Sequence, residues 1–176
     1  MIKLFIQGLA EGSHPINQQL PVESIPEASE EFFGDVTIEG TLRRLGSHFS
    51  FKGTTRCMAR LVCDRSLQEY NQEITANLEI DAKYGTTPSK IDGRYVDNGE
   101  KVLSVEDKFI DITQDVREEL AVSLPIKRLS PEYANKDFDE AFPEYSAKLH
   151  KRLKKQKGEI DERWQALEKL RIHKTL

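Results

Sequence analysis

The sequence predicts an α+β protein, with an antiparallel sheet of about five to seven strands followed by about three helices. Two observations lead to this prediction. Between Val36 and Tyr84, apolar and polar residues alternate with a period of two, as they do in strands with one buried and one solvated face. After Asp111, apolar residues recur every three to four positions, which is typical of helices packed on one side.

The first part of the chain reads as strands separated by turns. Ile2, Leu4 and Ile6 alternate with their neighbours and predict a short first strand. Residues 20–34 are rich in Pro, Glu and Ser, which favours a loop. The buried faces of the next three strands are expected to contain Val36, Ile38 and Leu42, then Phe49, Phe51, Cys57, Ala59, Leu61 and Cys63, then Tyr70, Ile74, Ala76, Leu78, Ile80, Ala82 and Tyr84. A turn at 46–47, a loop or loose hairpin over 86–98 and a final segment at 109–111 complete the sheet region.

The two longest strands can be paired on paper. Folding residues 49–63 back on 70–84 through the connection 64–69 pairs residues whose numbers add up to about 133. Arg60 then lies opposite Glu73 and Lys52 opposite Asp81, and each such pair stabilises a sheet by roughly 0.2–1 kcal/mol. The basic stripe Lys52, Arg56 and Arg60 therefore has two interpretations, cross-strand ion pairing or contact with RNA phosphates.

The last part of the chain reads as helices. Asp111 or Thr113 is suited to cap a helix over 112–124, in which an apolar residue recurs every four positions until Pro125 ends it. An acidic linker over 131–143 follows, with Tyr133, Phe138 and Phe142 as its anchors, and then helices over 144–157 and 162–171. Trp164 is expected to dock the last helix. We therefore expect a sheet domain over 1–127 and a helical appendage over 128–176.

Charge is unevenly distributed along the chain. The formal net charge is −4, so any contact with nucleic acid must come from a local patch. Residues 132–144 carry five acids and one lysine, whereas residues 146–174 carry ten Lys and Arg against four acids. Within the latter, residues 148–157 contain six cations and no acid, so this helix has no internal ion pairs.

Three interpretations of this basic helix remain open. It is a solvated helix neutralised by Asp137, Asp139, Glu140 and Glu144, a surface that binds RNA phosphates, or a surface that binds an acidic protein. The primary candidates for RNA binding are Lys148, Lys151, Arg152, Lys154, Lys155 and Lys157, and the secondary candidates are Arg43, Arg44 and Arg65.

Several classes of protein are not supported by the sequence. No apolar run approaches the ~18 residues of a membrane span, and two cysteines cannot form a disulfide framework. Cys57 and Cys63 are expected in the core. The chain has no glycine-rich phosphate loop, no GxSxG and no HExxH motif. We therefore expect a cytoplasmic, non-enzymatic protein without a metal or cofactor.

Short motifs along the chain occur in the order found in a known family. Residues 110–113, 116–120 and 124–127 read IDIT, VREEL and LPIK, and residues 63–67 read CDRSL. Residues 8–12 read GLAEG, and residues 161–167 read DERWQAL. Together they resemble the IDLT, VREEL, LPIK, CxRCL, GLxxG and DPRWxAL motifs of the large ribosomal RNA subunit accumulation protein family, the YceD-like proteins. Many members carry a cysteine cluster suited to zinc after LPIK, whereas residues 130–157 of this chain contain no cysteine.

The resemblance implies a function in the accumulation, processing or assembly of 23S rRNA in the large ribosomal subunit. It implies large-subunit rRNA or a pre-50S particle as the partner, with a ribosomal protein or assembly factor as a further candidate. Two other classes remain open. One is an adaptor that docks on a protein through a sheet edge or the Phe138 and Phe142 region without RNA contact. The other is a metal-dependent nuclease that uses clustered acids.

Overall fold

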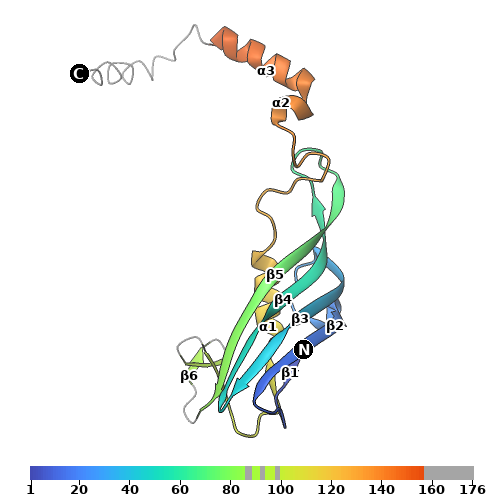
Figure 1. Ribbon diagram of the computed structural model, residues 1–176. Helices are drawn as coiled ribbons and strands as arrows, with labels where there is room; N and C mark the ends of the chain where they lie inside the picture. Colours follow the sequence, from blue (N-terminus) through green and yellow to red (C-terminus); the bar gives the residue numbers. More distant parts are fainter. Residues whose placement is uncertain (86–88, 92–93, 98–99, 157–176) are drawn as a thin grey trace, which may run out of the picture. The chain divides into compact units, whose positions relative to one another are not determined.

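The computed structural model describes residues 1–85, 89–91, 94–97 and 100–156, and only the backbone of 89–91, 94–97 and 153–156. The predicted α+β class is confirmed (Figure 1). The chain divides into two compact units, Met1–Arg128 and Leu129–Leu176, which are described separately. None of the described helices is long and apolar enough to cross a membrane.

The first unit is built on a seven-stranded sheet. Its order is β2 (Gly12–Pro21), β3 (Phe32–Leu45), β4 (His48–Val62), β5 (Glu69–Tyr84), β8 (Glu100–Leu103), β7 (Arg94–Asp97) and β6 (Ser89–Ile91). Neighbours are antiparallel, as predicted, except β5 and β8, which are parallel, so the sheet is mixed. Between β5 and β8 the chain reverses twice, at β6–β7 and at β7–β8, and β8 therefore runs in the direction of β5. A second, two-stranded sheet pairs β1 (Lys3–Phe5) with β9 (Phe109–Asp111).

The core lies on the face of the sheet that the alternation predicts. The predicted inward residues of β3, β4 and the first strand are buried, as are those of β5 from Ile74 to Ala82. The two cysteines, Cys57 and Cys63, are buried and free, as expected. Helix α1 (Thr113–Val122) packs Val116 and Leu120 into the same core, which explains why its apolar stripe is short.

The loop predicted over 20–34 is wrong at both ends. Strand β2 reaches Pro21, a 3₁₀ turn η1 (Val22–Ser24) follows, and β3 already begins at Phe32. Strand β2 contains Pro15 and Pro21, and it lies at the edge of the sheet, where a missing N–H costs no ladder bond. A bulge between Phe33 and Thr37, with Gly34 at φ 75°, separates the two halves of β3.

The predicted register of β4 against β5 is wrong by two residues. Lys52 pairs with Glu79 rather than Asp81, and Arg60 with Asn71 rather than Glu73. The connection runs from residue 63 to 68, so it begins and ends one residue earlier than predicted, because Glu69 already pairs with Val62. A shift of two residues leaves every side chain on its predicted face.

The start of α1 is hydrogen-bonded to β9 and to the residue that precedes β1, at the two-stranded sheet. Asp111 Oδ1 accepts hydrogen bonds from the Thr113 N–H at 2.9 Å and from its hydroxyl at 2.5 Å. The Thr113 oxygen accepts a bond from the Ile2 N–H at 2.7 Å. Both predicted capping residues therefore act at this terminus, although the N-cap position itself is Ile112.

The second unit contains α2 (Phe138–Ala141) and α3 (Pro143–Gln156). The segment 131–143, which was predicted to be a linker, therefore contains the short helix α2. Its predicted anchors contact each other: the ring of Phe142 stacks on Tyr133 at 5.9 Å and lies 5.6 Å from Phe138. The helix predicted over 144–157 is confirmed as far as residue 156. The helix predicted over 162–171 and Trp164 lie outside the described residues.

Candidate nucleic-acid interface

Helix α3 presents three described cations to solvent. Lys148, Lys151 and Arg152 are exposed, and within the part of the chain that the structure describes they form no ion pair. Lys148 lies over the ring of Tyr145, with Nζ 5.7 Å from the centroid, rather than pairing with Glu144. Lys154 and Lys155 lie within α3, but their side chains are outside the described set, and Lys157 is outside the described residues.

Three of the four acids that were candidates to neutralise this helix make contacts in the turn that precedes it, and the fourth, Glu144, lies in the first turn of α3 and forms no ion pair among the described residues. Asp139 Oδ1 accepts a hydrogen bond from the hydroxyl of Ser146 at 2.6 Å, and Ser146 is the one buried polar residue described in α3. Glu140 Oε2 accepts a hydrogen bond from the N–H of Asp137 at 3.3 Å, as in a capping box. These acids stabilise the turn between α2 and α3, and their described contacts leave the cations of α3 unpaired.

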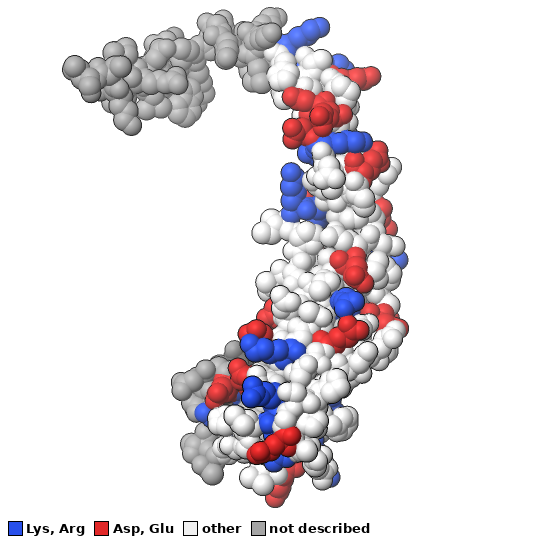
Figure 2. All heavy atoms as spheres, in the orientation of Figure 1, with Lys and Arg blue, Asp and Glu red and all other residues white. Residues whose placement is uncertain are grey.

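The cations of the first unit are arranged differently. Six of them pair with carboxylates from other elements of the unit, and Figure 2 shows the two signs interspersed on its visible face. The pairs are Lys52–Glu79, Arg56–Glu39, Lys83–Glu100, Lys101–Asp115, Arg117–Glu27 and Arg128–Glu31. Arg60 lies over Phe33 at 5.4 Å. Lys52 and Arg56 thus form cross-strand ion pairs, which is the first of the two interpretations, whereas Arg60 contacts an aromatic ring instead of the predicted Glu73.

The secondary candidates occupy three different settings. Arg43 is exposed on β3. Arg44 donates to the carbonyl oxygens of Leu9 and Gly46 and lies over Phe49, so its guanidinium serves the fold. Arg65 is half-buried and already interacts within the protein.

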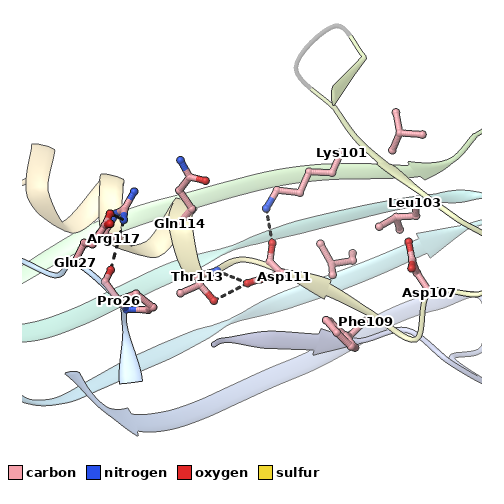
Figure 3. Close-up of a pocket in the computed structure, with 12 residues that line it drawn as sticks. Pro26, Glu27, Lys101, Leu103, Asp107, Phe109, Asp111, Thr113, Gln114 and Arg117 are labelled. Atoms are coloured by element: carbon pink, nitrogen blue, oxygen red, sulfur yellow. Dashed lines mark hydrogen bonds and ion pairs between the residues drawn. The ribbon is translucent and has the colours of Figure 1, made fainter. Parts of the chain in front are cut away.

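A groove of about 580 Å³ lies between β8, β9 and α1 (Figure 3). Its two cations are neutralised at opposite ends: Lys101 contacts Asp115 and the carbonyl oxygen of Asp111, and Arg117 contacts Glu27 at 2.7 Å. Lys101 therefore spans from β8 to the open edge of β9, and a charged side chain of this kind protects a strand edge from pairing. The groove thus offers no unpaired cation to a phosphate.

Metal-ligating side chains do not gather in the described residues. No group of three or more His, Cys, Asp or Glu there is placed to hold an ion. Burial raises the pKa of the Cys57 thiol, whose Sγ lies 3.7 Å from the carbonyl oxygen of Phe33. Such a thiol is a packing residue rather than a ligand or nucleophile.

One feature of α3 was missed by the sequence reasoning. Tyr145 is 66% exposed and lies on the same side of the helix as Lys148, Leu149 and Arg152. Their spacing of i, i+3, i+4 and i+7 is readable in the sequence, but only the cations were considered as candidates there. The ring of Tyr145 packs edge-on against Phe142 at 6.4 Å.

The fold and the site define an α+β protein with a helical unit that carries unpaired cations. Residues 51–171 match the family model described as large ribosomal RNA subunit accumulation protein YceD. The match covers more than half of the chain, and the chain belongs to this family, as its motifs predicted. The range includes the CDRSL, IDIT, VREEL and LPIK segments, whereas the GLAEG segment precedes it. Neither the curated proteins nor the solved structures include a match to the chain.

Proposed function

We propose that this protein supports the accumulation, processing or assembly of 23S rRNA as a non-catalytic factor, and that it binds rRNA phosphates through α3. The family description connects its members with accumulation of the large ribosomal RNA subunit. The observation that supports the mechanism is that Lys148, Lys151 and Arg152 lie together on one short helix, exposed and without an ion pair among the described residues, whereas six cations of the first unit are each held by a carboxylate.

Unpaired cations favour a polyanion for a physical reason. Phosphate contacts release condensed counterions from the nucleic acid, and this gain needs side chains that are not already neutralised. A cation such as Arg56, 2.7 Å from Glu39, would first have to break its own pair. Lys148 and Arg152 have no ion pair to break among the described residues, and Lys148 gives up only its contact with the ring of Tyr145. Contacts of this kind position RNA without reading its sequence.

The test compares two double variants of the full-length protein. Lys148→Gln/Arg152→Gln and Lys52→Gln/Arg56→Gln each remove one lysine and one arginine, four positions apart, and change the net charge equally. Binding to a 23S rRNA transcript is measured by filter retention over a series of KCl concentrations. We expect the α3 variant to flatten the slope of log K against log [salt] by about 1.4–1.8, since each lost phosphate contact contributes about 0.7–0.9.

The control variant should retain the slope of the native protein. If the α3 variant also retains both affinity and slope, the phosphate mechanism is wrong. An equal loss in both variants would indicate an effect of net charge alone and would also contradict it. Incubation of the rRNA with the pure protein and Mg²⁺ tests the non-catalytic assignment, because cleavage would identify a nuclease.

The adaptor is the second candidate, and one observation favours it. Phe138 and Leu149 are about half exposed in the second unit, so apolar surface is available to a protein. Crosslinking in growing cells separates the two functions. An adaptor yields crosslinks to a ribosomal protein or assembly factor and none to RNA, whereas the proposed mechanism yields RNA crosslinks that map to α3.

A further inference from the structure

One side of α3 combines an aromatic ring with cations. Tyr145, Lys148, Leu149 and Arg152 follow the helical spacing i, i+3, i+4 and i+7, and we call this surface the Tyr145 face. The side chain of Tyr145 is 66% exposed and that of Leu149 is 47% exposed. The face contains two positive charges and no acid.

The ring of Tyr145 is exposed but held in place. Its edge packs on Phe142 at 6.4 Å with an interplanar angle of 84°, and Phe142 in turn stacks on Tyr133 at 5.9 Å. The next residue, Ser146, is buried and bonded to Asp139, which fixes the start of α3 against α2. A ring positioned in this way loses little conformational entropy when a ligand covers it.

We propose that the Tyr145 face binds single-stranded RNA, with the ring of Tyr145 stacked on an unpaired base and with Lys148 and Arg152 on the adjacent phosphates. The inference rests on the proposed function, because it names the class of RNA that α3 recognises. Lys148 Nζ lies over the ring, 5.7 Å from its centroid, so a cation is adjacent to the stacking surface, and a base that stacks on this face takes the place of the ammonium group as Lys148 moves to the phosphate. Aromatic side chains stack on splayed-out bases, whereas the bases of a duplex are covered by their neighbours.

Charge favours RNA over a protein helix as the occupant. The apolar part of the face is narrow, since it consists of Tyr145 and Leu149, and Lys148 and Arg152 lie beside it. A protein helix docked there would have to be acidic along its contact edge. Single-stranded RNA supplies both negative charge and exposed ring faces along its whole length.

The test uses a labelled oligouridine strand and the same strand annealed to oligoadenosine, with anisotropy as the readout and the full-length protein as the binder. Tyr145→Ala should weaken single-strand binding by about 5- to 150-fold, the range for loss of one stacked base. Tyr145→Phe should bind as the native protein does, because stacking needs the ring and not the hydroxyl. The salt slope should stay unchanged in both variants, since neither removes a phosphate contact.

The control is Phe5→Ala. Phe5 is also 66% exposed and also packs edge-on against one aromatic ring, that of Phe109 at 6.4 Å, but it lies in the first unit. This variant should bind both probes as the native protein does.

The inference is overturned if Tyr145→Ala binds the single strand normally, or if it loses the single strand and the duplex equally. In the first case, a continuing loss in Lys148→Gln/Arg152→Gln leaves the proposed function intact. A lower melting temperature together with loss of both probes assigns Tyr145 to packing and overturns the inference. If neither probe nor the 23S transcript binds the native protein, the proposed function itself fails, and protein-only crosslinks then identify the adaptor.

Discussion

Thr55 is a polar side chain in an apolar part of the first unit, and replacing it with valine should stabilise the fold. It is fully buried on the inward face of β4, and its hydroxyl has no hydrogen-bond partner among the described residues. In register it lies between Ile38 of β3 and Ala76 of β5, both buried. An unpaired buried hydroxyl costs about 1–3 kcal/mol, because it gives up its hydrogen bonds to water and gains none.

The expected gain in the free energy of unfolding follows from the replacement of the Thr55 hydroxyl. Thr55→Val replaces the hydroxyl with a methyl of similar shape, removes the desolvation cost and leaves no cavity. We therefore expect the free energy of unfolding to rise by about 1–3 kcal/mol. The corresponding rise in melting temperature is on the order of 4–11 °C for a unit of this size.

The assay is urea unfolding followed by far-UV circular dichroism, with Thr54→Val as the matched control. Thr54 is the next residue and points to the solvated face, between Glu39 and Asn77, so its substitution should change the midpoint little. A higher midpoint at an unchanged m-value for Thr55→Val supports the reasoning. If Thr55→Val is neutral or destabilising, the hydroxyl is satisfied in solution and the argument from burial is refuted.

Two further predictions concern charge and pH. A double-mutant cycle on Lys101 and Asp115, whose side chains are 16% and 20% exposed, should give a coupling of about 1–3 kcal/mol, against less than about 1 kcal/mol for Lys52 and Glu79, at 70% and 72% exposed. Equal couplings in the two cycles would contradict the role assigned to burial. Burial raises the pKa of the Cys57 thiol, so the folded state retains this proton at a pH where the unfolded state loses it. Stability should therefore fall as pH rises above the ordinary thiol value of 9.0, and less so in Cys57→Ala, as urea midpoints over a pH series would show. The same fall in both proteins would count against this assignment.

The faces of the strands could be predicted because one face of the sheet is buried and the other is solvated. Alternation alone placed Phe51 and Leu78 in the core, where the structure has them. It fixes only which side a residue faces, so the register of β4 against β5 remained open by multiples of two. The turn between β4 and β5 sets this register: Leu67 adopts φ 59°, and its N–H donates to the carbonyl oxygen of Cys63 at 2.9 Å. The alternation of apolar and polar residues does not predict the geometry of this turn.

Strand β2 was missed for a different reason. It contains Pro15, Gln18 and Gln19, which are poor strand residues in isolation, and its inward side chains are only half-buried. An edge strand needs one partner, and β3 supplies a ladder from Gly12↔Arg44 to Pro21↔Asp35. The extended conformation of such a strand depends on pairing with its neighbour, so its own sequence only weakly predicts a strand.

The basic helix could be predicted from the sequence, whereas the pairing state of the cations in the sheet could not. The difference lies in how far apart in the sequence a cation and its carboxylate partner are. In the first unit the partners are far apart in sequence, as in Arg117 with Glu27, so a local count of charges could not show that these cations are neutralised. For α3 the nearest acids lie in α2 and in the first turn of α3 itself, and a local count suggested neutralisation. Two of those acids are instead engaged by hydrogen bonds, with Asp139 on Ser146 and Glu140 on the N–H of Asp137. The cations of the helix are therefore left without these partners because of how the turn between α2 and α3 is built, in which Asp139 is held by the hydroxyl of Ser146.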